Sequence, residues 1–250
     1  MKLIKPSYRI ETPINGEEIL IAIEAAGRTA YKSEGKIEIL EQRTNIGGKE
    51  YSRIGISAHE FLSKLLKRGH EAPLELGGMI NVRFICDRGV THELVRHRLA
   101  SFVQESTRYC NYANGKDIEF IIPSWLDIKE GVYNLNKDYD NFSEYDGTLT
   151  WLDSINKDEI KYNNLVNQIN PKTGKVDLRF RKWSPQEARS ILPNSLKTEI
   201  VIGANIREWR YILRLRTAEG VHPQMRELMC PLLEDFKKQI PILFDDIKGE

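Results

Sequence analysis

The chain has 250 residues, and its 37 lysines and arginines are almost balanced by 36 aspartates and glutamates, which gives a net charge of +1 at neutral pH. A protein that binds nucleic acid through its phosphates needs a surplus of basic residues, so this balance argues against a sequence-independent nucleic-acid binder. Hydrophobic residues make up 40% of the chain and charged residues 29%, as in ordinary globular proteins rather than disordered ones.

The three cysteines are widely spaced and form no Cys-x-x-Cys pair. This odd number argues against a disulfide framework or a zinc ribbon and favours a reducing compartment. The start of the chain, MKLIKPSYRIETP, lacks the apolar core of a secretory signal, and no apolar stretch is long enough to cross a bilayer. We therefore expect a cytoplasmic protein without a membrane partner.

The first half of the chain alternates between strand and helix patterns. Apolar residues at helical spacing predict a helix over 16–31. A second helix is expected to begin at Ser57, with Glu60 completing a capping box. The other elements predicted here are strands over 1–12, 79–86 and 119–122 and a helix over about 91–99.

Residues 128–182 differ from their surroundings in being rich in Asn, Asp, Lys and Tyr. They contain a predicted helix over 151–169, and a turn at 171–174 precedes the alternating stretch 176–183. We interpret the segment as an insertion that elaborates one domain. Its basic residues predict a hairpin that is exposed to solvent. The alternative is that they bind an anionic tail of a substrate. These residues are Lys172, Lys175, Arg179, Arg181 and Lys182.

The C-terminal part begins with strong helix-start signals, since Ser184, Pro185 and Glu187 suit the N-cap, N1 and N3 positions. A short helix through Leu192 is followed by a predicted strand over 198–202, a long helix over 205–218 and a final helix. No repeat and no regular βαβ rhythm is present. We therefore predict a single α+β domain over 1–250, with a mixed, largely antiparallel sheet packed against helices.

The densest chemical segment is RHRLASFVQESTRY, residues 96–109. Arginine side chains hold phosphate through paired N–H donors, and hydroxyl groups complete such sites. The segment favours a nucleotide or another phosphorylated ligand; the alternative is a charged helix face that continues into a loop. Because Ser106 has no base nearby in the sequence, we expect it to donate or accept hydrogen bonds rather than act as a nucleophile.

A zinc site is not expected at His92 and His97, although the segment resembles the zinc-protease pattern. On a regular helix, five residues place the two rings about 140° apart around the axis, so they could not share one ion. No other histidine cluster stands out, and the sequence predicts no metal. Glycine patterns of P-loop and Rossmann proteins and the Gly-x-Ser-x-Gly elbow are also absent from the sequence.

A second cluster of arginines lies toward the C-terminus. On a helix, Arg207 and Tyr211 share a face, and Asn205 and Arg216 return to nearly the same side. Such a helix could meet two ligands, or one ligand and a partner subunit. The alternative is an exposed helix that is merely rich in arginine.

Three ordered motifs together resemble the flavin-dependent thymidylate synthases. The segment Arg96-His97-Arg98, seven residues, Ser106-x-Arg108 is similar to the family signature. Upstream, GHEAPLE at 69–75 resembles a second family stretch, and 187–228 resembles the C-terminal half. The resemblance covers roughly residues 55–110 and 185–230, and residues 128–182 match little of the family.

The resemblance implies the reductive methylation of dUMP to dTMP, with methylenetetrahydrofolate as carbon donor and FAD, reduced by NADPH, as hydride donor. Arg216 would be catalytic by polarising the uracil ring, because a fixed cation stabilises a developing anion. The residues implied for FAD are His70, Ala72, Arg96, His97, Arg98, Gln104, Asn205, Arg207 and Tyr211. Those implied for dUMP are Glu93, Arg96, Gln104, Glu105, Ser106, Thr107, Arg108, Arg189 and Arg216.

The family is also homotetrameric, with active sites built where subunits meet, which the resemblance carries over as an expectation. Three positions depart from the usual pattern: Tyr211 replaces Asn or His, Ala72 lacks a frequent hydroxyl, and Leu76 replaces a frequent histidine. The rival interpretation from another class is a non-catalytic nucleotide- or RNA-binding module that uses the same arginines.

Overall fold

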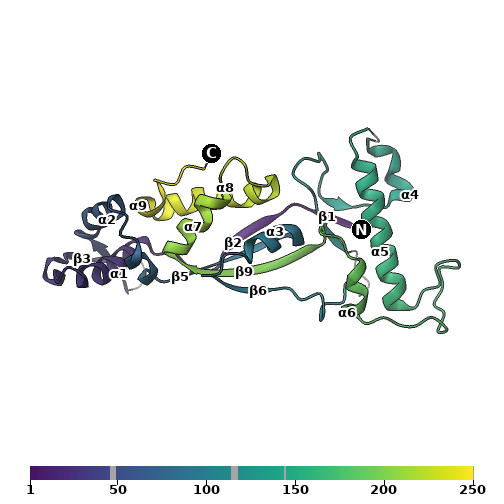
Figure 1. Ribbon diagram of the computed structural model, residues 1–250, viewed down its shortest axis with the longest axis horizontal. Coiled ribbons are helices and arrows are strands. Elements are labelled where there is room, and N and C mark those ends of the chain that lie inside the picture. The colour runs from purple at the N-terminus through teal and green to yellow at the C-terminus, as the bar shows by residue number, and fades with distance from the viewer. Residues whose placement is uncertain (46–48, 114–117, 144, 250) are drawn as a thin grey trace. The chain divides into compact units, whose positions relative to one another are not determined.

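The computed structural model describes residues 1–45, 49–113, 118–143 and 145–249 (Figure 1). Internal contacts divide the chain into two compact units. Unit 1 consists of Met1–Ser7, Phe84–Arg96 and Val103–Ile200, and unit 2 of Tyr8–Arg83, His97–Phe102 and Val201–Glu250. Each unit is described separately below, and the single domain over 1–250 stays a prediction.

Four strands form the largest sheet, and each of them has residues in both units. In sheet order they are β2 (Ser7–Ile10), β5 (Met79–Asp87), β9 (Lys197–Asn205) and β6 (Ser101–Gln104). In β5 and β9, buried residues mostly alternate with more exposed ones, as a strand covered on one face requires. The strands predicted at 79–86 and 198–202 are confirmed, and β9 extends further at both ends.

Unit 2 contains most of the helices. The predicted helix over 16–31 is confirmed as α1 (Gly16–Thr29), which begins where the Asn15 side chain accepts a hydrogen bond from the backbone N–H of Glu18. The other helices of this unit are α2 (Ala58–Lys67), the 3-10 helix η2 (Ala72–Leu76), α7 (Ile206–Arg216), α8 (Pro223–Gln239) and α9 (Pro241–Phe244).

The core of unit 2 lies where α7 and α8 pack together. Trp209 on α7 is fully buried, with its ring centroid 5.6 Å from that of Phe236 on α8. Its indole N–H donates to the carbonyl oxygen of Ile80 on β5 at 2.9 Å, so the buried polar atom is satisfied. This contact fixes α7 against the sheet strand that it covers.

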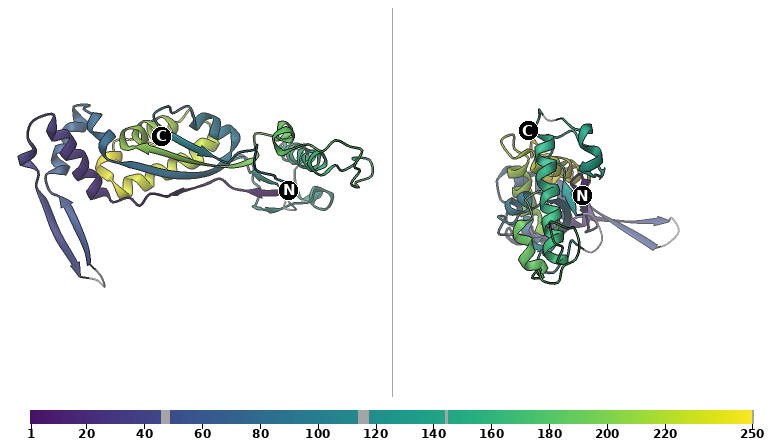
Figure 2. Two further views of the ribbon diagram at one scale, coloured as in Figure 1. Left: turned by 90° about the horizontal axis from the view of Figure 1, so that it is seen from below. Right: turned by 90° about the vertical axis from the view of Figure 1, so that its right-hand side faces the viewer.

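An antiparallel hairpin, β3 (Ile39–Asn45) and β4 (Lys49–Gly55), also belongs to unit 2 and follows the 3-10 helix η1 (Glu34–Lys36). Figure 2 shows this hairpin extending away from α1 and α2 of the same unit. No strand was predicted from the sequence over these residues.

Unit 1 combines a small mixed sheet with helices. Strand β1 (Lys2–Ile4) pairs parallel with β7 (Glu119–Ile121) and antiparallel with β8 (Gly131–Val132). The helical elements are α3 (Arg88–Leu94), α4 (Leu135–Asp138), η3 (Tyr139–Asn141), α5 (Thr148–Asn167), α6 (Pro185–Ala188) and η4 (Arg189–Ile191). Helices and mixed sheets without a βαβ rhythm confirm the α+β class.

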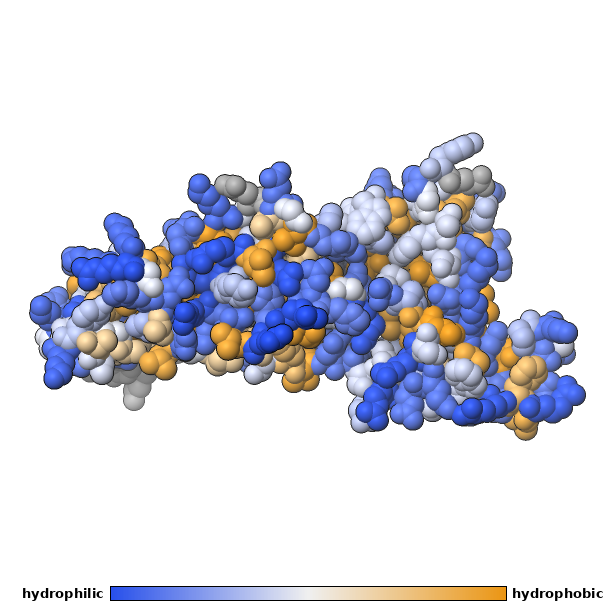
Figure 3. Space-filling view, in the orientation of Figure 1, coloured by the Kyte–Doolittle hydropathy of each residue, from blue (hydrophilic) through white to orange (hydrophobic). Residues whose placement is uncertain are grey.

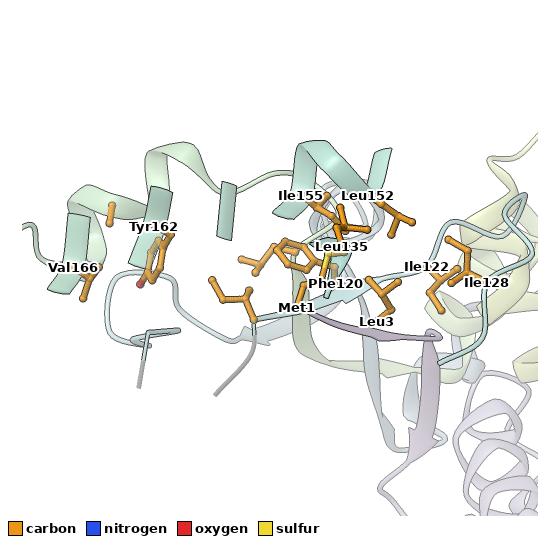
Figure 4. Packing of buried hydrophobic residues seen from close by; sticks show 13 residues of the cluster. Met1, Leu3, Phe120, Ile122, Ile128, Leu135, Leu152, Ile155, Tyr162 and Val166 are labelled. Atoms are coloured by element: carbon orange, nitrogen blue, oxygen red, sulfur yellow. The ribbon is translucent and has the colours of Figure 1, made fainter. Parts of the chain in front are cut away.

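The segment 128–182 contributes directly to the core of unit 1. Leu152, Ile155 and Tyr162 on α5 are buried in one cluster with Leu3 and Phe120 from the small sheet (Figure 4). Burying this many apolar groups stabilises the folded chain by about 25 cal/mol per Å² of apolar surface. The segment is therefore an integral part of unit 1.

Helix α3 differs from its prediction over 91–99. Asp87 caps the helix, because its carboxylate accepts a hydrogen bond from the N–H of Val90 at 2.7 Å, and the helix starts at Arg88. It ends at Leu94, so Arg96, His97 and Arg98 lie in the loop that leads to β6. The basis for rejecting a zinc pair, a continuous helix over both histidines, was therefore wrong.

The capping box predicted at Ser57 is also wrong, because this hydroxyl has partners from elsewhere in the chain. Ser57 Oγ donates to Glu24 at 2.9 Å and accepts from the N–H of Glu38, while Glu60 pairs with Lys64. In contrast, the N-cap and N3 positions predicted for Ser184 and Glu187 are confirmed, and the two residues form a capping box.

The basic hairpin predicted after α5 forms only at its turn. Ile169 and Val176 make an isolated antiparallel bridge, and no strand follows over 177–183. All five basic side chains of this loop are exposed, which confirms that they are solvated. Figure 3 shows strongly hydrophilic and apolar side chains intermixed on this loop. In the described part of the chain, no helix is long and apolar enough to cross a membrane.

Candidate functional site

The residues predicted to bind ligands fall into two groups by unit. Unit 2 holds most of the flavin set: His70, Ala72, His97, Arg98, Asn205, Arg207 and Tyr211, together with Arg216. Unit 1 holds most of the dUMP set: Glu93, Arg96, Gln104, Glu105, Ser106, Thr107, Arg108 and Arg189. Their roles stay predictions, but the surroundings of each group show which chemistry it can support.

A pocket of about 560 Å³ in unit 2 brings together three of the predicted flavin residues, His70, Ala72 and Arg207. Its remaining wall is mostly small or apolar, from Ala26, Gly27, Ala30, Tyr31, Leu65, Gly69, Pro73 and Leu76, with Glu71. The pocket thus joins an apolar surface to a cationic side chain and an imidazole, a combination suited to a nucleotide with aromatic rings and phosphates.

The polar side chains of this pocket are held by neighbours in the same unit. The Tyr31 hydroxyl lies 2.7 Å from Nδ1 of His70. Arg207 makes an exposed ion pair with Glu75, with Nη1 and Oε1 2.6 Å apart. Because both partners are nearly half exposed, this pair contributes little to stability, and an anionic ligand could replace the carboxylate.

His97 lies in the loop before β6, and its side chain is only 3% exposed. Arg216 Nε donates to His97 Nε2 at 3.0 Å, and His97 Nδ1 lies 3.6 Å from a carboxylate oxygen of Glu208. The Tyr211 ring meets the imidazole edge to face, with centroids 5.6 Å apart. Three α7 residues therefore surround this histidine.

These surroundings keep the imidazole neutral. Burial, followed by the charge of Arg216, lowers the pKa of His97 from 6.5 to about 4. Burial also raises the pKa of Glu208. The backbone N–H of Glu208 donates to the Asn205 side chain at 2.9 Å, so Asn205 is the N-cap of α7. The predicted flavin residue Asn205 thus has a structural role as well.

The lowered pKa of His97 predicts a pH-dependent stability. The unfolded chain protonates this histidine near pH 6.5 and the folded chain only near pH 4, so the unfolded state binds more protons between these values. We expect His97 to lower the free energy of unfolding by about 2–3 kcal/mol as the pH falls across this window. Urea denaturation at pH 7 and pH 4.5 measures the effect. A His97→Gln variant with an unchanged pH dependence would contradict the assignment.

Unit 1 contains an arginine cluster around the signature segment. Arg108 and Arg189 both have exposed side chains, and Arg189 Nη1 donates to the Thr107 hydroxyl at 3.3 Å. Ser106 Oγ accepts a hydrogen bond from the N–H of Arg108 at 3.3 Å. Two accessible guanidinium groups beside two hydroxyl groups form a surface suited to a phosphate.

The neighbouring residues Gln104 and Glu105 already have partners in unit 1. Gln104 Nε2 donates to the hydroxyl groups of Thr91 and Thr198 at 3.0 and 3.3 Å. Glu105 accepts from the Tyr112 hydroxyl at 2.7 Å and from Lys197 Nζ at 3.1 Å. These bonds fix the C-terminal end of β6, and the residues of the arginine cluster follow directly after it in the sequence.

The remaining predicted residues have less defined surroundings. Arg96 and Arg98 are exposed in the loop after α3, and Ala72 is exposed at the start of η2. Glu93 is half-buried on α3 and has interactions with its neighbours. Within the described residues, no group of three or more His, Cys, Asp or Glu side chains could hold a metal ion.

Sequence reasoning missed the residues that support the site. Lys197, Tyr112 and Tyr31 contact predicted site residues from distant parts of the chain, and no local pattern pointed to them. Glu75 did carry a signal, because it lies in the GHEAPLE motif, and Glu208 lies within the arginine-rich helix.

Comparison with known proteins shows the family to which this chain belongs. Residues 16–242 match the family described as thymidylate synthase complementing protein. The flavin-dependent thymidylate synthase of Corynebacterium efficiens is 30% identical over 96% of this chain and 83% of its own length. The enzyme of the same name from Mycobacterium sp. (strain JLS) is 28% identical over 98% of this chain and 85% of its own.

A solved structure shares the fold. The UMP/dUMP methylase PolB from Streptomyces cacaoi, bound with 5-Br dUMP, has a TM-score of 0.65 at 17% sequence identity, covering 98% of this chain and 96% of the other. The chain therefore belongs to the thymidylate synthase complementing protein family, that of the flavin-dependent thymidylate synthases, and is a methyltransferase with FAD as the cofactor that the family implies.

Proposed function

We propose that this protein converts dUMP to dTMP by reductive methylation, with methylenetetrahydrofolate as carbon donor and NADPH as reductant. The observation that best supports the proposal is the pocket of unit 2, where Arg207 meets His70 and Ala72 although it comes from a distant part of the chain. All three were predicted as flavin residues from the family motifs alone.

The residues of this pocket fit FAD. The small and apolar wall suits a flat aromatic ring, and the Arg207 guanidinium and the His70 imidazole suit the diphosphate. When bound and reduced by NADPH, FAD supplies the hydride that completes the methyl group. The chain's own residues bind the cofactor and keep water from the apolar part of the pocket.

Arg216 is the residue that we propose acts on the uracil ring. Its guanidinium is half-buried, so its charge is less screened by water than that of an exposed arginine. A fixed cation beside the ring favours the ionised form of the ring nitrogen and lowers the barrier for a step in which negative charge develops.

The arginine cluster of unit 1 is proposed to hold the phosphate of dUMP. We expect Arg108→Ala to weaken dUMP binding by roughly 10- to 150-fold, because a charge-assisted hydrogen bond contributes about 1.5–3 kcal/mol. Isothermal titration calorimetry measures the change. Arg179→Ala, which removes another exposed arginine of the same unit, is the matched control and should bind dUMP normally. Equal affinity in the Arg108 variant would refute the role.

No cysteine nucleophile is proposed. Cys86 is buried, and burial raises the pKa of its thiol, so it stays protonated. Cys110 is half-buried near Arg108, but the family signature ends before it. We expect Cys110→Ser to keep dTMP formation substantially intact, measured as tritium release from [5-³H]dUMP. Complete loss of release with dUMP still bound would show that a thiolate attacks the ring.

The assembly that we propose is a homotetramer with active sites shared between subunits. This rests on the family expectation and on α7, whose Arg207 and Arg216 lie far apart around the helix. Light scattering of the purified protein at several concentrations measures its oligomeric state, and we expect the mass of a tetramer.

One experiment separates the enzyme from the rival nucleotide- or RNA-binding module. The purified protein is loaded with FAD and mixed with dUMP, methylenetetrahydrofolate and NADPH, and dTMP is measured by chromatography. An enzyme bleaches the flavin band with NADPH and forms dTMP; a binding module binds the nucleotide but forms none. If the protein shows neither a flavin spectrum nor a flavin-dependent thermal shift, the proposal is wrong.

A further inference from the structure

The strongest observation beyond the proposed reaction is the bond between His97 and Arg216. It connects a loop of unit 2 to the last residue of α7 through one short contact, from Arg216 Nε to His97 Nε2 at 3.0 Å. Glu208 and Tyr211 contact the same imidazole from the preceding turns of the helix. The ring is thus held on several sides within one compact unit.

The chemistry of this contact fixes the tautomer of His97. A guanidinium only donates hydrogen bonds, so Nε2 must offer its lone pair, and the proton of the neutral ring is on Nδ1. Nδ1 faces the Glu208 carboxylate at 3.6 Å, beyond hydrogen-bonding distance, and has no hydrogen-bond partner among the described residues. Among the described residues, Arg216 and Glu208 are the charged groups in contact with the ring, and Tyr211 is a further titratable group beside it.

The contact also fixes the orientation of the Arg216 guanidinium. An arginine side chain loses conformational entropy when it becomes ordered, so one without a fixed contact would be poorly oriented before a ligand arrives. His97 accepts from Nε, so the two Nη groups of Arg216 take no part in the imidazole contact. The edge formed by these two groups carries the paired donors that planar ligands accept.

We propose that His97 is a positioning residue, which holds the Arg216 guanidinium so that its Nη edge meets the uracil ring of dUMP. This inference rests on the proposed function and deepens it, because it assigns the histidine of the signature to the nucleotide substrate through Arg216. A preorganised donor of this kind needs no reorientation when the ring becomes charged.

Two substitutions at His97 test the inference. His97→Phe keeps a ring of similar size but has no acceptor, whereas His97→Gln places an amide oxygen at about the reach of Nε2. We expect the Phe variant to lower kcat/KM for dUMP about tenfold or more, and the Gln variant to restore most of the loss.

A double-mutant cycle distinguishes positioning from general packing. In an Arg216→Ala background there is no guanidinium to orient, so His97→Phe should have little further effect on dUMP affinity, measured by calorimetry. If the Phe substitution weakens dUMP binding equally in both backgrounds, or not at all in either, the inference is overturned.

A measurement on the unmodified protein does not depend on turnover or on variants that fold. In protein labelled with ¹⁵N-histidine, long-range ¹H–¹⁵N spectra report the tautomer of each imidazole, and the His97→Gln spectrum identifies the resonance. We expect the Nδ1–H form at pH 7; the Nε2–H form overturns the inference. A wild-type protein that makes no dTMP but shows the Nδ1–H form and coupled dUMP binding refutes the proposed reaction and leaves the His97–Arg216 assignment supported.

Discussion

Replacing Arg216 by lysine should lower the turnover number for dTMP formation by about a hundredfold to a thousandfold, the range found when one preorganised donor of an anionic transition state is removed. A lysine keeps the positive charge, but its compact ammonium cannot reproduce the planar set of donors. It also lacks the Nε that donates to His97. The loss should appear in kcat at saturating dUMP, because the interaction strengthens as charge develops on the ring.

Arg214→Lys is the matched control for this variant. It lies two residues earlier on α7, its side chain is exposed, and its nearest carboxylate oxygens are 3.9 Å or more away. We expect its turnover to stay within about twofold of the wild type, in line with the small contribution of such surface pairs. The thermal unfolding midpoints of both variants should stay close to that of the wild type. A fully active Arg216→Lys variant would show that the planar fork is not needed.

The largest expected loss of stability comes from Trp209→Ala. Replacing this fully buried indole leaves a large cavity against Phe236 and leaves the carbonyl oxygen of Ile80 without its donor. We expect the free energy of unfolding to fall by about 4–5 kcal/mol. Because whole domains are stable by only about 5–15 kcal/mol, this loss would leave much of the chain unfolded at modest temperature. Urea denaturation followed by circular dichroism measures it.

Trp125→Ala is the comparison for the Trp209 variant. This tryptophan is 61% exposed, so truncation removes little buried surface and should cost less than about 1 kcal/mol. Similar losses in both variants would mean that α7 is not held to the sheet through its indole.

The elements that the sequence predicted well depend on local signals. The start of α6 follows from Ser184 and Glu187, which bond to each other's backbone within one turn, and β5 follows from the alternation of apolar and polar residues over 80–84. Helix α3 was misplaced for a related reason. Its cap, Asp87, is also the last residue of strand β5, so the helix follows the strand without an intervening loop.

The parts that were not predicted depend on contacts between distant residues. Ser57 has the local pattern of a helix cap, yet Glu24 and Glu38 bind its hydroxyl and decide its role. The same holds at the candidate site, where Lys197 supports Glu105 from a strand far along the chain. Motifs predict which residues meet a ligand, but only the folded structure shows which side chains hold those residues in place.

The helix α5 has a consequence for how freely the chain can vary among related organisms. Its buried positions fill space beside the first strand, and a filled core tolerates exchanges among apolar residues when total volume is kept. Sequence identity between relatives could therefore be very low across residues 128–182 while the spacing of large apolar side chains is kept. A search for this segment in other genomes would do better to compare hydrophobic patterns than letters, and a shortened version of the protein without it would expose Leu3 and Phe120 to water.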